Sequence, residues 1–298
     1  MINLAALRYR DVLAADGGPI ERLSCGETSV LGARWFEANA YLRSEHAPGR
    51  YARHVYGAAD GTGTDRSPML ARFKAVSEAI ERWAQMSTLA GGEGGRYGFD
   101  VDPSSNGMAA YPGLWHRQAR WSALMEAAER FNLMNWWEGR LEARTVAAPW
   151  PGLGAAVIES EAPGVTVLLW RKSPRGYTAY GHAAARNFVK ACERAVVELE
   201  RHDLVIRYYA LTHTAAERSG RTESELHTSE RRCLFFAFEE GSALFEERLA
   251  GSRTSRGKAR PQIVFDGVIR GPWEHYATVW RVLYAPPSDR FLAPDLGY

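Results

Sequence analysis

Two short segments of nearly the same sequence place glutamate and arginine side chains at a spacing that can bind metal ions and phosphate groups. Both read Glu-x-x-Glu-Arg, with Glu78 and Glu81 in the first segment and Glu126 and Glu129 in the second. Residues three apart in a helix lie on the same face. Two carboxylates on one face can ligate a magnesium ion, and the arginine that follows can bind a phosphate through two hydrogen bonds.

The same spacing has a simpler interpretation, and the residues alone leave both open. A charged helix face is most often solvated, and Glu78 with Arg82 and Glu126 with Arg130 match i,i+4 ion pairs worth about 0.2–0.5 kcal/mol each. A third charged segment, residues 194–198, lies in another helix-like stretch. Like charges on neighbouring helices repel each other unless a cation lies between them, so three such segments favour a bound metal–phosphate group.

The elements that would carry these segments follow from hydrophobic periodicity, which predicts helices from about Pro68 to Met86, Leu114 to Trp137 and Ala184 to Tyr209. On the first helix the expected buried stripe is Leu70, Phe73, Val76, Ile80 and Trp83. Runs of β-forming residues predict strands at 145–148, 155–158, 165–170, 177–180, 262–265 and 276–284. We therefore expect an α+β fold with helices packed on antiparallel β-sheet.

No linker divides the chain, so we expect one globular unit overall, with an N-terminal segment of uncertain role at residues 1–60 and the main domain at 61–298. The first 60 residues are expected to form strands and loops. Residues 61–63 read Gly-Thr-Gly, which favours a turn over a phosphate-binding loop. The basic segment 252–260 is expected to be a mobile loop.

Composition excludes several classes of protein. The 37 basic and 35 acidic side chains leave a net charge of +2, which gives little support for nucleic-acid binding. Three scattered cysteines form neither a disulfide framework nor a zinc motif, and the histidines lack zinc-site spacing. No signal peptide or membrane-spanning run is present. We expect a cytoplasmic protein that binds neither membrane nor nucleic acid.

Three further groups could do chemistry, but we prefer a structural interpretation for each of them. Cys192 lies on an apolar stripe and is expected to be a buried structural thiol. His202 and Asp203 could act as a general base and its orienting partner, but a polar pair at a helix end is the preferred interpretation. His182 follows Gly181 and could approach a substrate, although a structural place is preferred for it as well.

Taken in order, these segments resemble the YcaO family, whose members use ATP to modify peptide backbones. The resemblance runs through residues 61–63, 74–82, 105–110, 122–130 and 194–198, and the stretch 281–290 resembles the family's late strand and turn. The ordered set is far more specific than any one segment. It implies a YcaO-like fold with an ATP site between helices, which needs no P-loop, and the chain has no P-loop motif.

The resemblance also implies roles by position. Magnesium ions would be held by Glu78, Glu81, Glu126 and Glu198, and the phosphates of ATP would contact Arg82 and Arg194. Ser122 would be a polar nucleotide contact, with Glu129 and Arg130 as further residues of the same site. The substrate supplies the nucleophile in this family, so no catalytic residue is assigned.

The implied activity is ATP- and Mg²⁺-dependent modification of a ribosomally synthesised precursor peptide, with azoline-forming cyclodehydration of Cys, Ser or Thr as the first choice. A thioamide-forming enzyme and a degenerate scaffold or regulatory subunit are the alternatives. The implied partners are the precursor peptide and a leader-recognition protein of the E1-like or RRE type. A homodimer is a further expectation.

Four departures from the family pattern bear on this choice. Lys74 stands where the family usually has serine, and Ser122 stands where glutamine is common. Few residues connect Arg82 to Asn106, so a strand-rich insert is expected to be missing. Residues 294–298 do not resemble the proline-rich tail of azoline-forming members, which weighs against heterocyclisation.

Overall fold

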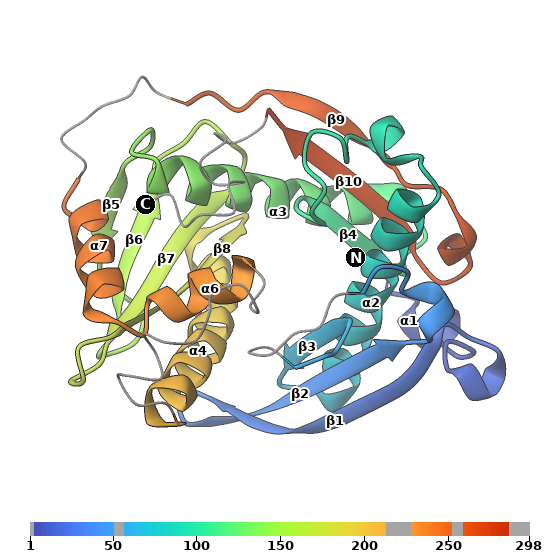
Figure 1. Cartoon of the computed structure of the whole chain (residues 1–298), viewed down its shortest axis with the longest axis horizontal. Helices are drawn as coiled ribbons and strands as arrows, with labels where there is room; N and C mark the ends of the chain where they lie inside the picture. The colour runs from blue at the N-terminus through green and yellow to red at the C-terminus, as the bar shows by residue number, and fades with distance from the viewer. Residues whose placement is uncertain (1–2, 51–56, 213–227, 252–258, 286–298) are drawn as a thin grey trace. The chain divides into compact units, whose positions relative to one another are not determined.

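The computed structural model describes residues 3–50, 57–212, 228–251 and 259–285, which belong to two compact units (Figure 1). The first unit contains residues 3–50, 58–127 and 262–285, and the second contains Gly57 and residues 128–212, 228–251 and 259–261. The boundary falls inside helix α3 (His116–Trp137). Both units combine helices with antiparallel sheet, which confirms the predicted α+β class.

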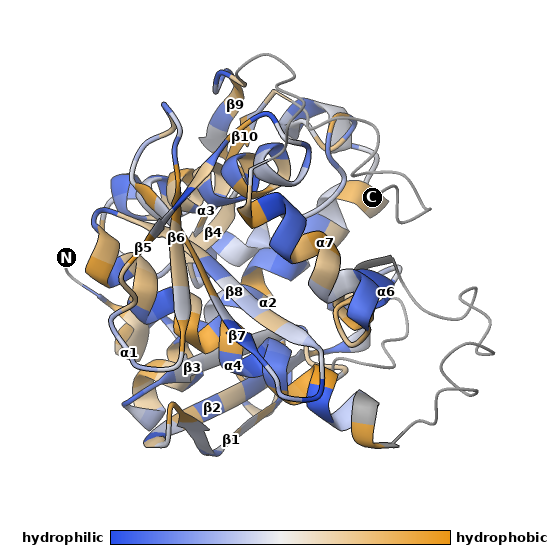
Figure 2. Cartoon of the chain, turned by 90° about the vertical axis from the view of Figure 1, so that its left-hand side faces the viewer, coloured by the Kyte–Doolittle hydropathy of each residue, from blue (hydrophilic) through white to orange (hydrophobic). Residues whose placement is uncertain are grey.

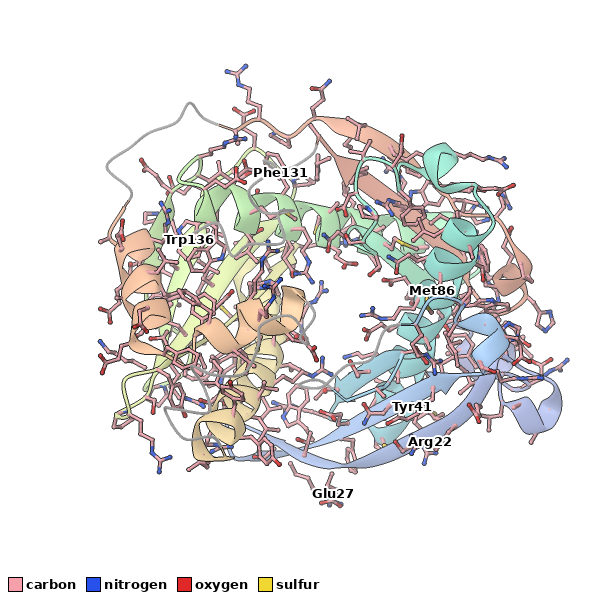
Figure 3. The ribbon with its side chains drawn as sticks, in the orientation of Figure 1. Arg22, Glu27, Tyr41, Met86, Phe131 and Trp136 are labelled. Atoms are coloured by element: carbon pink, nitrogen blue, oxygen red, sulfur yellow. The ribbon has the colours of Figure 1, made fainter. Side chains whose placement is uncertain are left out.

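The first sheet of the first unit is an antiparallel meander in the order β1 (Ile20–Val30), β2 (Ala33–Leu42) and β3 (Gly61–Asp65). Across β1 and β2 the guanidinium of Arg22 lies 3.8 Å from the ring centre of Tyr41 (Figure 3). Short helical segments precede and follow the hairpin at α1 (Ala5–Arg8), η1 (Ala14–Asp16) and η2 (Ser44–His46). The expected strands are confirmed, with short helices in addition.

Helix α2 (Pro68–Ala90) lies directly on β3 because small residues face each other there. Ala71, Ala75 and Ala79 are fully buried. A Cβ atom at Gly61 would lie 2.1 Å from the carbonyl oxygen of Ala75, and one at Gly63 would lie 2.1 Å from that of Ala71. The predicted turn at residues 61–63 is therefore wrong: these glycines are strand residues that allow a helix backbone to come close.

The buried face of α2 is rotated from the predicted stripe. Val76, Ile80 and Trp83 are buried as expected, but Leu70 is 39% exposed and Phe73 is only partly buried. The hydrophobic periodicity of a sequence is dominated by its large side chains. It therefore did not reveal that the alanines of α2 pack against the glycines of β3.

The second sheet of this unit brings together distant parts of the chain in the antiparallel order β4 (Met108–Tyr111), β10 (Thr278–Tyr284) and β9 (Ile263–Val268). The two predicted C-terminal strands are confirmed. Short helical segments lie at η3 (Gly94–Tyr97) and η5 (Pro272–His275). The N-terminal part of α3 also belongs to this unit.

The second unit contains the predicted antiparallel meander, in the order β5 (Ala143–Val146), β6 (Gly154–Ile158), β7 (Val165–Lys172) and β8 (Thr178–Ala185). Its helices are the C-terminal part of α3, with α4 (Phe188–Thr212), α6 (Thr228–Phe235) and α7 (Glu239–Leu249). Hydrophobic and hydrophilic residues both occur along α7 (Figure 2), as expected for a helix with one buried face.

Helix α4 begins later than predicted because Ala184 and Ala185 belong to β8. Asn187 precedes the helix, and its side-chain oxygen accepts a hydrogen bond from the main-chain nitrogen of Lys190 at 3.0 Å. No helix of the described residues is both long and apolar enough to cross a bilayer. The expected mobile loop at 252–260 lies almost entirely outside the described residues.

We expect Gly61→Ala and Gly63→Ala to lower the midpoint of urea unfolding, because the added methyl group would meet helix backbone. Overpacking of this kind costs about 1–3 kcal/mol. Gly26→Ala is the matched control in β1, where an added Cβ meets nothing within 4 Å. Equal midpoints for all three variants would show that α2 does not depend on this close contact.

Candidate functional site

Glu78 is fixed by the strand next to its helix. Its Oε2 atom accepts hydrogen bonds from the main-chain nitrogen of Thr62 at 3.0 Å and from the hydroxyl of Thr62 at 3.2 Å. Its Oε1 atom is 3.4 Å from a terminal nitrogen of Arg82. Because β3 is the last strand of its sheet, Glu78 supplies an acceptor that a further strand would otherwise provide.

The other predicted residues of the first unit are Glu81, Ser122 and Glu126, all of which are half-buried. Glu81 and Glu126 both act electrostatically on one guanidinium, that of Arg281 in β10. Sequence reasoning did not place Arg281 in the site, because only its position in a late strand was recognised.

Arg281 is fully buried and donates hydrogen bonds to the carbonyl oxygens of Ser104 at 3.0 Å and Asp102 at 2.6 Å. Burial lowers the pKa of Arg281 to about 10, and the negative charges of nearby carboxylates, including Glu126 and Glu81, oppose this shift. The guanidinium therefore stays charged at neutral pH. It offsets part of the repulsion that clustered carboxylates would otherwise feel.

Lys74 is held at the end of β3. Its Nζ atom donates to the carbonyl oxygen of Thr64 at 2.9 Å and forms an ion pair with Asp65, also at 2.9 Å. Burial alone would raise the pKa of Asp65, but the hydrogen bond and charge of Lys74 leave it below its ordinary value. These two contacts give the ammonium group a defined place on the strand.

In the second unit, Glu129 differs from the half-buried glutamates of α2 because it is only 7% exposed. Oε1 lies 2.8 Å from Nδ1 of His182, and Oε2 accepts from the main-chain nitrogen of Ala184 at 3.1 Å. Burial alone would raise the pKa of Glu129. The His182 hydrogen bond and the charges of His182, Arg130 and Arg194 instead lower it to about 2.

Arg194 and Glu129 meet at the same residue of β8. Arg194 donates to the carbonyl oxygen of Ala184 at 2.9 Å, while Glu129 accepts from its main-chain nitrogen. Glu198 is 51% exposed and pairs with Arg201 at 3.1 Å. The structure thus brings Glu129 and Arg194 together at one strand residue, whereas the described contact of Glu198 lies within its own helix.

Among the described residues, no three His, Cys, Asp or Glu side chains are gathered closely enough to hold a metal ion. Carboxylate oxygens are nevertheless the donors that Mg²⁺ prefers. Glu78, Glu81 and Glu126 are half-buried rather than sealed in the core, so the donor set fits Mg²⁺ in its chemistry.

The structural interpretation of Cys192 is confirmed, whereas the predicted helix-end pair of His202 and Asp203 is wrong, because both residues lie inside α4 and have separate partners. His202 lies between the main-chain groups of Tyr180 and Cys233, and Asp203 pairs with Arg171 at 3.2 Å, so no histidine–aspartate catalytic pair is described. Cys192 is fully buried, and burial raises the pKa of its thiol to about 11. It is therefore a poor nucleophile at neutral pH.

No family model matches the chain, and neither does any curated protein. Solved structures do match, and two of them cover most of its length. YcaO from Methanopyrus kandleri, bound with AMPPCP and Mg²⁺, has 13% sequence identity and a TM-score of 0.57, with 99% of this chain and 92% of that chain covered. The chain has the YcaO fold.

The second structure agrees with this assignment. The E. coli microcin synthetase McbBCD complex with pro-MccB17 bound has 12% identity and a TM-score of 0.52, and covers 88% of this chain and 87% of that chain. At these identities the likeness concerns the fold. The YcaO-like α+β architecture expected from the sequence is confirmed, and residue roles stay predictions.

We expect Glu129→Gln to destabilise the protein by about 1.5–3 kcal/mol, because it weakens two hydrogen bonds to a buried charge. Since the pKa of Glu129 is lowered from 4.5 to about 2, its charge stabilises the fold above pH 4.5, and this contribution is lost as pH falls towards 2. Urea unfolding at several pH values checks both statements.

The control for this measurement is Glu159→Gln, which removes an exposed carboxylate of the same unit that pairs with Arg144. It should change stability little. If Glu129→Gln and Glu159→Gln behave alike between pH 7 and pH 3, the buried charge does not hold α3 to β8.

Proposed function

We propose that this chain is an ATP- and Mg²⁺-dependent enzyme that modifies the backbone of a ribosomally synthesised precursor peptide. The observation that carries the proposal is the pair of Glu-x-x-Glu-Arg segments on α2 and α3 within the YcaO fold. The structure with AMPPCP and Mg²⁺ supports the choice of nucleotide and metal. The complex that carries pro-MccB17 supports a peptide substrate.

The residues that would hold Mg²⁺ are Glu78, Glu81, Glu126 and Glu198, and those that would contact the phosphates are Arg82 and Arg194. Ser122 would be a polar nucleotide contact, and Arg130 a supporting cation. Glu129 would act indirectly, because its two oxygens already bind His182 and Ala184. When bound, Mg-ATP supplies the phosphoryl group that turns the substrate's amide oxygen into a phosphate leaving group.

The protein's own work in this reaction is positioning and charge neutralisation. Glutamates approach a triphosphate only through divalent cations, and the arginines neutralise phosphate oxygens directly. No nucleophile of the enzyme is needed, which agrees with the buried state of Cys192. Azoline formation from Cys, Ser or Thr is the first choice, and thioamide formation by an external sulfur donor is the alternative.

The proposed partners are the precursor peptide and a leader-recognition protein of the E1-like or RRE type, acting in the cytoplasm. The neighbouring synthetase is itself a multi-protein complex, which supports a partner protein. A homodimer is a further expectation.

Calorimetric titration with AMPPCP tests the nucleotide site. We expect Mg²⁺-dependent binding by the wild type and a loss of roughly 10–100-fold in affinity for Glu78→Gln and Glu126→Gln, because each removes a charged ligand. Glu193→Gln, which removes an exposed carboxylate of α4 that pairs with Lys190, is the control and should bind normally. Thermal midpoints show whether each variant is folded.

Absence of binding by a well-folded wild type, even with a partner protein added, would favour the other candidate, a scaffold or regulatory subunit with a degenerate site. Lys74 and Ser122 at the family's serine and glutamine positions are the observations behind that candidate. Binding without precursor-dependent ATP turnover in the presence of the partner would favour it as well.

A further inference from the structure

A segment of the first unit is repeated in the second at an offset of 120 residues. Residues 61–82, which span β3 and most of α2, align without gaps with residues 181–202, which span the end of β8 and most of α4. The identical pairs are Gly61 and Gly181, Arg66 and Arg186, Ala71 and Ala191, Ala75 and Ala195, Val76 and Val196, and Glu78 and Glu198. The aligned alanines are fully buried in both copies, and the two valines are buried equally.

The helix start is built in the same way in both copies. The side chain of Ser67 accepts a hydrogen bond from the main-chain nitrogen three residues later at 3.4 Å, and the side chain of Asn187 accepts the equivalent bond at 3.0 Å. Both are N-cap residues at aligned positions. The alignment therefore follows the structure as well as the sequence.

The helix–strand contact is also the same. A Cβ at Gly61 would lie 2.1 Å from the carbonyl oxygen of Ala75, and a Cβ at Gly181 would lie 2.2 Å from that of Ala195. Ala75 and Ala195 occupy aligned positions. The next contacts are also aligned, since the Cβ at Gly61 would meet the main-chain nitrogen of Ala79 and the Cβ at Gly181 would meet that of Leu199. The two strand–helix modules thus pack at the same point and at the same distance.

Lys74 aligns with Arg194, and the two cations make the same contact. The Nζ atom of Lys74 donates to the carbonyl oxygen of Thr64 at 2.9 Å, and Nη1 of Arg194 donates to that of Ala184, also at 2.9 Å. Thr64 and Ala184 are themselves aligned. Each cation is followed four residues later by the aligned glutamate, Glu78 or Glu198.

We propose that Lys74 is the first module's counterpart of Arg194, a cation that fixes its helix on the last strand of its sheet and supplies positive charge to the nucleotide site. Lysine at the position of the family's usual serine would then contribute to the nucleotide site and would not indicate a degenerate site. The nucleotide part of this inference rests on the proposed function, whereas the helix-fixing part does not.

Two measurements on one set of variants separate these parts, and the first is thermal unfolding. Lys74→Met and Arg194→Met should each lower the thermal midpoint by about 2–4 °C, since each removes a bond between a helix and a strand. Lys74→Arg should keep the wild-type midpoint, because its guanidinium can still donate to Thr64. Lys190→Met removes an exposed lysine that pairs with Glu193 on α4 and is the control, with no shift expected.

Titration of the same variants with AMPPCP and Mg²⁺ tests the nucleotide part. Lys74→Met and Arg194→Met should lose affinity by similar factors, about tenfold each, while Lys74→Arg and Lys190→Met bind like the wild type. Loss in Arg194→Met with full affinity in Lys74→Met would overturn the equivalence. So would a normal thermal midpoint for Lys74→Met beside a lowered one for Arg194→Met.

If the wild type binds no AMPPCP, the proposed function fails, and the thermal comparison still decides whether the two modules are equivalent. If the wild type binds and Lys74→Met is too unstable to titrate, Lys74→Gln provides a neutral polar variant for the same comparison. Unchanged affinity in that variant would also overturn the proposal.

Discussion

The charged side chains of this protein depend on an uncharged contact, the close approach of a helix backbone to a strand that carries glycine. At Gly61 and Gly181 the missing side chain lets a helix turn lie directly on the strand. At that separation Lys74 and Arg194 reach strand carbonyl oxygens from the helix. A Cβ at either glycine would meet helix backbone and force the helix away from the strand.

The outer edge of the last strand is used in the same way in each unit. Glu78 accepts the main-chain hydrogen of Thr62 in β3, and Glu129 accepts that of Ala184 in β8. Both strands are last in their sheets. A carboxylate that binds such an edge satisfies backbone groups that would otherwise face solvent or another chain. Charge is therefore part of the fold as well as of the site.

Much of this arrangement could be predicted from the sequence. Periodicity located all three long helices and the meander, and the repeated Glu-x-x-Glu-Arg segments pointed to the YcaO fold. The sequence could not show that Glu81 and Glu129, which occupy the same position in the two Glu-x-x-Glu-Arg segments, differ in burial, because the place of Glu129 depends on His182 and Ala184. The sequence-based prediction of a turn at residues 61–63 was also wrong, because the sequence does not distinguish a strand glycine that packs against a helix from a glycine in a turn.

The buried charges bear on the choice between an enzyme and a scaffold. A chain that needs only its fold can replace a buried charged group by an apolar side chain of similar volume, often at no loss of stability. Here Arg281 is fully buried, and it is held by main-chain carbonyl oxygens under the electrostatic influence of Glu81 and Glu126. Glu129 is buried beside Arg194 in the second unit. Arg281 and Glu129 lie beside predicted nucleotide-site residues of their own units, whereas the buried carboxylates of Asp60 and Asp203 pair with Arg50 and Arg171. Charge is thus buried where it serves the fold as well as beside the proposed nucleotide site.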